Sequence, residues 1–188
     1  MKGALIAVGV IVVLALLVGG NLMGSRNDLV TEREAIKASW SQVDVVLQRR
    51  ADMIPNLVET VKGFAKQEQS VIDSVTQARA AMMGAKSPSE KIAADGQISS
   101  ALGRLFVMVE SYPNLKSDQN FLRLQDELTG TENRIAVERR KYNEVVNKYN
   151  TDVQLFPKNI AASLFNFQTE DAYFKADAAS KEAPKVKF

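Results

Sequence analysis

The sequence has 188 residues with nearly balanced charge, 24 Lys and Arg against 22 Asp and Glu, and it contains neither cysteine nor histidine. The missing cysteines exclude disulfides, thiol catalysis and cysteine-bound zinc, and the missing histidines remove the commonest general base and metal ligand. Because the charges balance, nothing in the composition points to nucleic acid as a partner.

The stretch from Gly3 to Ser25 holds no charged residue. As a helix rising about 1.5 Å per residue, residues 4–23 span about 30 Å, the thickness of the hydrocarbon core of a bilayer. A cleaved signal peptide is the alternative, but the apolar run is long for one and no Ala-x-Ala motif follows it. We therefore predict a retained transmembrane anchor over residues 1–25.

A helical seam of period 3.5 follows the anchor and predicts one long helix over residues 28–83. Pro55 removes one backbone hydrogen bond, so we expect a kink there, and Gly84 ends the pattern. With Arg33, Arg50 and Glu68 filled in, the seam alternates by three and four residues, and its apolar positions are Leu29, Ile36, Trp40, Val43, Leu47, Ile54, Leu57, Val61, Phe64, Val71, Val75, Ala78 and Met82.

Two further long helices are expected. Ser87-Pro88-Ser89-Glu90 forms a capping box that begins a helix over 88–112, which Tyr112-Pro113 ends. A third helix follows over 118–156, and a short fourth over 159–165. The remaining residues, 166–188, lack periodicity and are predicted to be a mobile C-terminal tail. The predicted fold is all-α: a single N-terminal transmembrane helix followed by an elongated antiparallel helical bundle over residues 26–165.

Three blocks of this sequence resemble the LemA family of bacterial membrane proteins: WSQVDVVLQRRADMIPNLVETVKGF, ESYPNLKSDQNFLRLQDELTGTENRIAVERRKYNEVVNKYN and FPKNIAA. The resemblance covers about residues 27–167 and the preceding span. It implies one N-terminal anchor carrying an antiparallel helical bundle. It implies no assigned activity, although one branch of the family is associated with building magnetosome membranes.

Charged residues on the predicted helices allow two interpretations. Arg49 and Arg50 either bind an anionic ligand or lipid headgroup, or pair with carboxylates inside the bundle, and we favour pairing. A second set is expected to form a solvated, salt-bridged face: Glu127, Glu132, Arg134, Glu138, Arg139 and Arg140. No motif frames a nucleophile, a phosphate loop or a metal site. We therefore predict no catalytic residue, no cofactor and no metal.

The helix lengths predict an interface. A first helix of about 55 residues, roughly 80 Å long, would extend beyond the shorter second helix, and its membrane-proximal half would find no helical partner within the chain. We therefore predict a self-association stripe. The alternative is that the segment after Phe165 folds back and covers the stripe. The stripe consists of Leu29, Ile36, Trp40, Val43 and Leu47.

These observations predict a non-enzymatic, membrane-anchored, self-associating helical scaffold that organises or shapes the membrane or its protein partners. The alternative function is an adaptor or regulatory subunit of a membrane enzyme such as a protease. The expected partners are the lipid bilayer, further copies of the chain and a membrane protein, but no nucleic acid. The expected location is the bacterial inner (cytoplasmic) membrane, with a single span and the soluble domain outside the cytoplasm.

Overall fold

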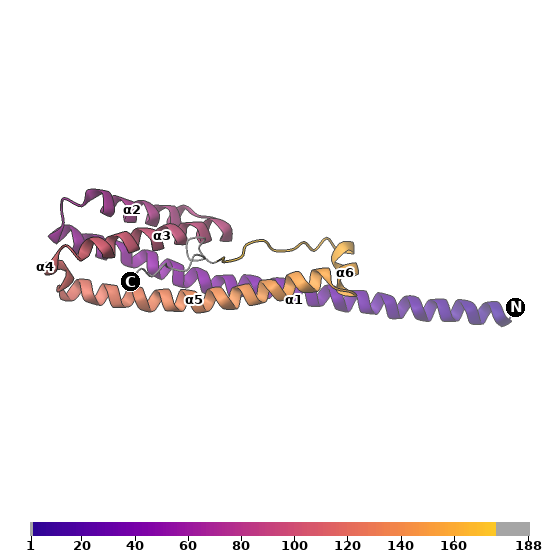
Figure 1. Cartoon of the computed structure of the whole chain (residues 1–188). Coiled ribbons are helices and arrows are strands. Elements are labelled where there is room, and N and C mark those ends of the chain that lie inside the picture. The colour runs from indigo at the N-terminus through magenta and orange to yellow at the C-terminus, as the bar shows by residue number, and fades with distance from the viewer. Residues whose placement is uncertain (1, 176–188) are drawn as a thin grey trace, which may run out of the picture. The chain divides into compact units, whose positions relative to one another are not determined.

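The computed structural model describes residues 2–175, and all regular structure within them is helical (Figure 1), which confirms the all-α prediction. Among these residues, one compact unit, unit 1, comprises residues 2–39 and 141–171, and a second, unit 2, comprises residues 40–140 and 172–175. The helices in chain order are α1 (Lys2–Phe64), α2 (Gln69–Gly84), α3 (Pro88–Val109), α4 (Pro113–Lys116), α5 (Gln119–Gln154) and α6 (Lys158–Leu164).

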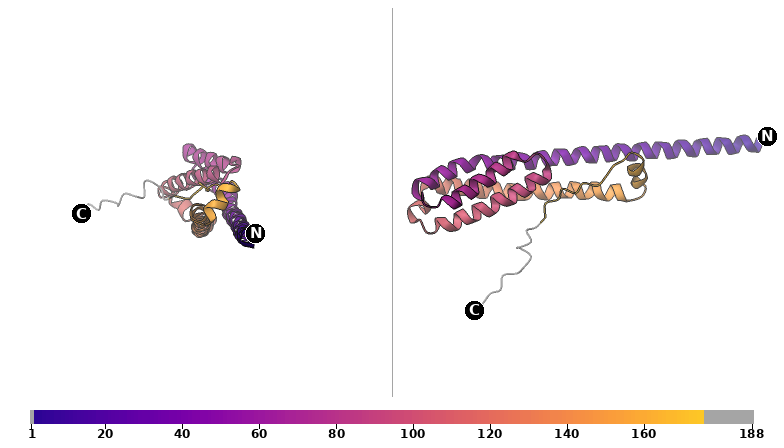
Figure 2. Two further views of the ribbon diagram at one scale, coloured as in Figure 1. Left: turned by 90° about the vertical axis from the view of Figure 1, so that its right-hand side faces the viewer. Right: turned by 90° about the horizontal axis from the view of Figure 1, so that it is seen from above.

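Unit 2 is a bundle of four helical segments: the end of α1, then α2, α3 and the beginning of α5. Helix α2 returns antiparallel along α1, since Arg79 Nε donates a hydrogen bond to the Ala51 carbonyl at 3.1 Å. Helix α3 again follows the direction of α1, because the Nζ of Lys91 bonds Asp44, while Asp95, one turn later, bonds Arg50. Figure 2 shows α2 and α3 side by side.

The core of unit 2 contains most of the apolar seam expected from the sequence, closed by the facing sides of α2, α3 and α5. Phe64 of that seam is 44% exposed, and Ala65 and Ile72, which the seam did not include, are buried. Each large aliphatic or aromatic side chain that leaves water here contributes about 1.5–3 kcal/mol. The largest fully buried side chains of this unit are Val43, Leu47, Ile54, Leu57, Ile72, Ile98, Leu105, Leu115, Phe121 and Ile135.

The prediction of one helix over 28–83 is wrong, because the chain turns at residues 65–68 and α2 runs back along α1. Ala65 is fully buried in this turn, and Glu68 accepts a hydrogen bond at 2.8 Å from the hydroxyl of Tyr112. The seam continues in register across the turn and no proline marks it, so periodicity alone could not show it. Pro55 lies inside α1.

The other helix boundaries lie close to those predicted. Ser87 is the N-cap of α3: its hydroxyl accepts a hydrogen bond from the backbone N–H of Glu90 at 3.2 Å, and the Glu90 carboxylate accepts one in return from the N–H of Ser87. The carboxylate of Asp118 accepts hydrogen bonds from the backbone N–H groups of Asn120 and Phe121 at the start of α5. Helix α3 ends three residues earlier than expected, at Val109.

Unit 1 contains the first part of α1, the last part of α5, helix α6 and the extended segment that follows it. Helix α5 runs antiparallel to α1 here, and α6 lies beside α1 in Figures 1 and 2. Among the described side chains of α1, the first buried one belongs to Ser25. The packed part of unit 1 therefore begins where the uncharged stretch of the sequence ends.

The segment 166–175 belongs to the predicted mobile tail but is bonded to α5 in this structure. Tyr149 donates a hydrogen bond from its hydroxyl to the Gln168 carbonyl at 2.8 Å. The side-chain amide of Asn150 donates to the carbonyl of Glu170 and accepts from its N–H, both at 2.8 Å. The rest of the predicted tail, residues 176–188, lies outside the described residues.

Candidate functional site

The first functional feature is the anchor stretch, residues 3–25 of α1. Helix α1 is long and apolar enough there to cross a membrane, and none of its most apolar window is buried within the chain. Its large side chains from Leu5 to Val18 are more than half exposed, as for Leu5 at 73%, Leu16 at 71% and Val12 at 51%. A run of aliphatic side chains is stable in this state only when an apolar environment surrounds it.

The predicted self-association stripe is not an exposed surface. Leu29 and Ile36 are buried within unit 1, Val43 and Leu47 are buried within unit 2, and Trp40 is half-buried. The expectation that this half of the first helix lacks a partner within its own chain is therefore wrong.

The reason is the turn at residues 65–68. It lets α3 run again in the direction of α1, and α5, with 36 residues, then supplies a helical segment to each of the two units. The alternative expected from the sequence, coverage by the C-terminal segment, also holds in part. The ring of Phe174 stacks on Trp40 with the ring centroids 6.1 Å apart, and Arg33 lies over the ring of Phe167 at 5.2 Å.

The second feature is a buried cluster of four charged side chains in unit 2: Arg50 of α1, Asp95 of α3, and Glu132 and Arg139 of α5. Arg50 Nη1 lies 2.9 Å from Asp95 Oδ1 and 2.7 Å from Glu132 Oε2. Arg139 pairs with the other oxygen of Asp95, and its Nη1 lies 3.9 Å from Glu132 Oε1. Ser99 accepts a further hydrogen bond from Arg50 at 3.0 Å.

The buried cluster is electrically neutral, with two guanidinium groups against two carboxylates. Asp95 is fully buried and the side chain of Arg50 is 6% exposed. Because little water reaches either group, the ion pair itself must offset the cost of burying the two charges. Burial lowers the pKa of the Arg50 guanidinium, and the charge of Glu132 opposes that shift. The preferred interpretation of Arg50, pairing with carboxylates inside the bundle, is confirmed. Arg49 is exposed.

Sequence reasoning missed two aspects of this cluster. Asp95 was not singled out, although an aspartate within the apolar face of a predicted helix is the signal that could have found it. Glu132 and Arg139 were expected on a solvated face, whereas they close the buried cluster, with side chains 41% and 27% exposed. The ring of Phe174 covers Arg139, with the guanidinium carbon 5.1 Å from the ring centroid.

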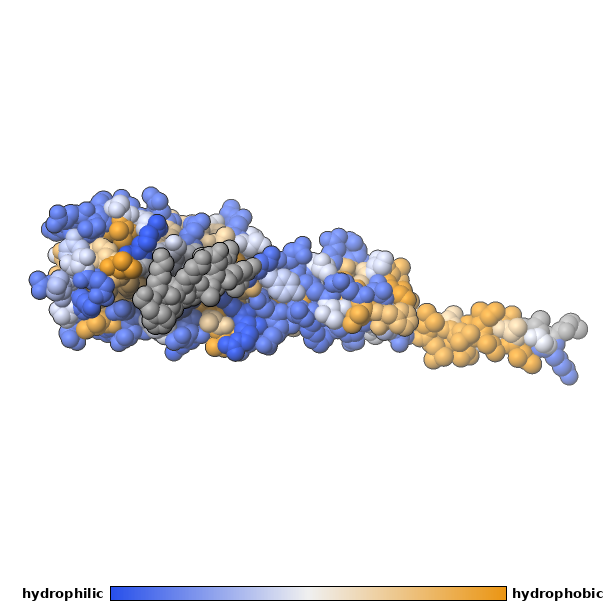
Figure 3. Space-filling model, viewed as in Figure 1, coloured by the Kyte–Doolittle hydropathy of each residue, from blue (hydrophilic) through white to orange (hydrophobic). Residues whose placement is uncertain are grey.

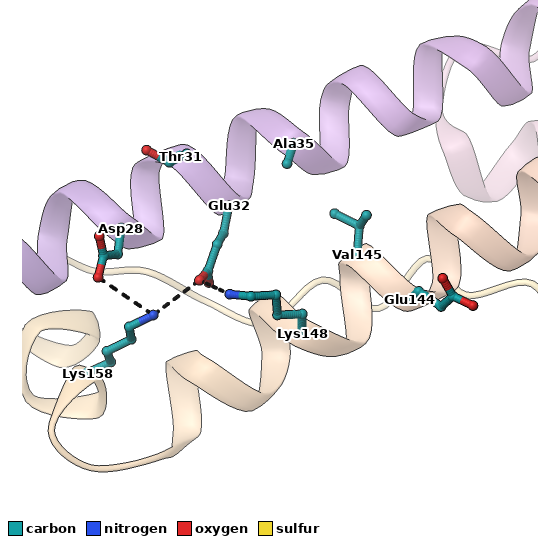
Figure 4. A pocket seen from close by; sticks show the side chains of 8 residues that line it. All are labelled: Asp28, Thr31, Glu32, Ala35, Glu144, Val145, Lys148 and Lys158. Atoms are coloured by element: carbon teal, nitrogen blue, oxygen red, sulfur yellow. Dashed lines mark hydrogen bonds and ion pairs between the residues drawn. The ribbon is translucent and has the colours of Figure 1, made fainter.

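The third feature is a groove of about 640 Å³ between α1 and α5 in unit 1 (Figure 4). Ala35 and Val145 face each other across it, and Lys148 and Lys158 both point toward Glu32. Its lining residues are Asp28, Thr31, Glu32, Ala35, Glu144, Val145, Lys148 and Lys158.

The charged side chains of this groove are bonded to one another, and we call Glu32, Lys148, Asp152 and Lys158 the groove cluster. Lys158 Nζ lies 2.6 Å from Asp152 Oδ2 and 3.1 Å from Glu32 Oε1. Lys148 bonds the same two carboxylates, at 3.0 Å to Asp152. Asp28 lies 3.8 Å from Lys158.

The groove cluster has little capacity for catalysis or for binding an anion. Hydrogen bonds to carboxylates raise the pKa of both Lys148 and Lys158, so neither is a base at neutral pH. The hydrogen bond from Lys158 holds the pKa of the Asp152 carboxyl well below its usual range, so this group is not an acid there. A phosphate would have to displace carboxylates that already neutralise the lysines. Within residues 2–175, no group of three or more acidic side chains is placed to hold a metal ion.

Comparison with known proteins identifies the family of this chain. The model of the LemA family matches residues 39–188. Magnetosome protein MamQ 2 of Paramagnetospirillum magneticum is 28% identical over 202 residues, covering 94% of this chain and 73% of the relative. Magnetosome protein MamQ of Magnetospirillum gryphiswaldense is 25% identical over 178 residues, covering 81% and 65%. Protein LemA of Metamycoplasma hominis is 24% identical over 165 residues, covering 87% and 73%. The chain therefore belongs to the LemA family, as the three sequence blocks indicated.

Proposed function

We propose that this protein is a non-enzymatic, membrane-anchored helical scaffold that self-associates and organises the membrane or the membrane proteins around it. The observation that carries the proposal is the anchor stretch, in which aliphatic side chains more than half exposed continue directly into the packed part of α1. The similarity to proteins named as magnetosome proteins supports a role at a membrane.

The absence of an enzymatic role is supported by the chemistry of the polar groups. The chain has no histidine or cysteine, and the buried cluster and the groove cluster each consist of charges that neutralise one another. Neither cluster offers a nucleophile next to a base. We propose that self-association uses a surface other than the predicted stripe, because the stripe packs within the chain.

Membrane integration and assembly are tested together on the full-length protein. Alkaline carbonate should leave the protein in the membrane fraction, and intact-mass spectrometry should find the chain beginning at Met1. Replacing Leu14 by Arg places a charge in the centre of the span at a cost of about 2.5–3.5 kcal/mol and should release protein from the membrane. Val107→Arg is the control, because Val107 of α3 is also an exposed aliphatic residue, at 74% against 55% for Leu14.

Analytical ultracentrifugation in mild detergent should find more than one copy per particle, and electron microscopy of vesicles carrying the protein should show altered membrane shape or clustered particles. A monomer at every concentration would remove the scaffold proposal. A stoichiometric membrane enzyme purifying with the protein would favour the alternative, an adaptor or regulatory subunit.

We place the protein in the bacterial inner membrane with its bundle outside the cytoplasm. The chain has no cysteine, so the variant Lys37→Cys carries a single thiol. This thiol should react with a membrane-impermeant maleimide once the outer surface of the inner membrane is accessible. Reaction only after the cells are opened would place the bundle in the cytoplasm.

A further inference from the structure

A second apolar surface lies where α5 turns into α6, and we call it the corner patch. Four large apolar side chains within ten residues are exposed to solvent: Leu155 at 58%, Phe156 at 78%, Ile160 at 49% and Leu164 at 64%. A cluster of exposed apolar side chains on a short segment of a bundle usually marks a contact with a partner or a membrane.

Helix α6 is held so that these side chains remain outside. Ala161 and Ala162 are buried, at 0% and 2% exposure, and fix one face of the helix against the bundle. Ile160 and Leu164 are four residues apart and therefore share another face, which is exposed. The exposure of the corner patch thus follows from how α6 packs.

The contacts of α6 with α1 place the corner patch directly beside the end of the anchor stretch. The guanidinium carbon of Arg26 lies 5.5 Å from the centre of the Phe165 ring, and Lys158 pairs with Asp28 at 3.8 Å. In an α-helix, Arg26 and Asp28 lie only about 4.5 Å and 7.5 Å along the axis beyond Met23. Both belong to unit 1, as does the corner.

These distances match the thickness of one membrane interface. The hydrocarbon core is about 30 Å thick, and the bilayer with its headgroups is about 40–45 Å, so each polar layer is about 5–8 Å deep. With the anchor stretch spanning the core, the height of Arg26 and Asp28 falls within the headgroup layer. Figure 3 shows apolar surface at this end of unit 1, next to the apolar stretch of α1.

We propose that the corner patch inserts into the headgroup and upper acyl region of the same membrane that the anchor stretch crosses. Unit 1 would then contact the bilayer at two places, through the span and through the α5–α6 corner. The inference rests on the proposed membrane anchoring, and it adds that the bundle is docked on the lipid surface. The occupant of the corner patch is lipid, because the patch adjoins a surface that itself requires lipid.

The experiment uses single-cysteine variants of the full-length chain, which has no cysteine of its own. Phe156 and Leu164 are replaced one at a time by cysteine and labelled with an environment-sensitive fluorophore. Because both side chains are exposed, the replacements remove no buried contact. Val13→Cys reports the centre of the span, and Lys37→Cys, about 21 Å beyond Met23 along α1, reports a polar position of the same unit.

The labelled proteins are reconstituted into phosphatidylcholine vesicles that carry a nitroxide either near the headgroup or near the end of the acyl chain. The labels at Phe156 and Leu164 should lose fluorescence mainly to the shallow nitroxide, and the label at Val13 mainly to the deep one. The label at Lys37 should lose little fluorescence to either nitroxide.

The possible failures are distinguishable. Quenching at Val13 without quenching at Phe156 and Leu164 would overturn the corner patch while leaving the anchor intact. No quenching at Val13 would remove the proposed anchoring itself. A blue-shifted emission at Phe156 that disappears when the protein is diluted into more lipid would assign the patch to a second copy of the chain and overturn the lipid contact.

Discussion

The buried cluster of unit 2 and the groove cluster of unit 1 both combine charges of the long helices α1 and α5 with one group from a third helix, Asp95 of α3 or Lys158 of α6, yet their surroundings differ. Asp95 in the buried cluster is fully buried, whereas Lys148 in the groove cluster has a side chain that is 63% exposed. The additional element in unit 2 is α3, which supplies Asp95 and covers Arg50. In unit 1 the groove remains open to water.

The difference determines what each cluster contributes to stability. Removing one partner of a buried pair leaves its counterpart without either water or an opposite charge, which costs about 3–5 kcal/mol. Removing one partner of an exposed pair costs about 0.2–1 kcal/mol, because water takes its place. We therefore expect ion pairs between helices to stabilise this fold most where α3 excludes solvent.

The largest expected effect tests the buried cluster directly. Asp95→Ala should lower the free energy of unfolding by about 3–5 kcal/mol, because Arg50 and Arg139 lose their shared carboxylate and the side chain of Arg50 is only 6% exposed. Thermal unfolding of the full-length protein in mild detergent, followed by circular dichroism, measures the loss. Asp126→Ala, at an exposed position of α5, is the matched control. Equal, small effects of both variants would contradict the comparison.

The next test asks whether the side chains around the buried cluster belong to a core or to an interface. Leu47→Ala should cost about 2–5 kcal/mol, because Leu47 is fully buried within the chain. The loss should be the same at every protein concentration. Val45→Ala, on the same helix but 63% exposed, should change stability by less than about 0.5 kcal/mol. If the loss of stability in Leu47→Ala grows as the protein is diluted, the stripe would instead be an interface between copies of the chain.

The N-cap of α3 is expected to contribute to the free energy of unfolding by an amount between those of the buried cluster and the groove cluster. Ser87→Ala removes the N-cap of α3 and should cost about 1 kcal/mol, since the N–H of Glu90 loses its acceptor. Ser89→Ala, at an exposed position in the first turn of the same helix, is the control. An unchanged unfolding temperature for Ser87→Ala would mean that the hydrogen bond in the capping box adds nothing to stability.

The smallest expected effect belongs to the groove cluster and depends on pH. Asp152→Asn should cost at most about 1 kcal/mol at neutral pH. Because the folded-state pKa of Asp152 is depressed, its contribution is complete well above the ordinary aspartate pKa of about 3.9 and is lost as the pH falls through the folded pKa. The difference between the variant and the wild type should therefore shrink on acidification. A difference that stays constant down to strongly acidic pH would rule out this linkage.

Lys148→Met tests the groove cluster by removing a positive charge instead of a negative one. The folded-state pKa of Lys148 is raised, so its contribution is present below the ordinary lysine pKa and is lost as the pH rises through the folded value. The two variants should thus converge on the wild type at opposite ends of the pH scale.

Much of the fold was predictable because its signals are local. The anchor stretch follows from an uncharged run of bilayer length, and the start of α3 follows from the four residues of its capping box. The pairing of Arg50 was predictable as well, because a guanidinium on an apolar seam needs carboxylates. Its partner on α3 was not, since only tertiary packing brings Asp95 to it.

The remaining features depend on contacts between distant parts of the chain. The turn after Phe64 has no proline, and the seam continues across it in register, so the energy that favours it comes from tertiary packing, which buries Ile72, Val75, Ala78 and Met82 of α2. That single boundary moved the expected end of the first helix by about twenty residues and produced the incorrect stripe. The corner patch was equally hidden, because exposed Leu155 and Phe156 fit the pattern of a core helix end.

The hydrogen bonds between Asn150 and the extended segment have a consequence for sequence variation. The side-chain amide of Asn150 bonds both the N–H and the carbonyl of residue 170, and the Tyr149 hydroxyl donates a hydrogen bond to the carbonyl of residue 168. These contacts involve main-chain atoms alone, so the identities of Gln168 and Glu170 are irrelevant to them. Position 150 lacks that freedom, because an aspartate there would accept a hydrogen bond but could not donate one. Substitutions at positions 168 and 170 would therefore leave these hydrogen bonds intact, whereas Asn150→Asp would lose one of them.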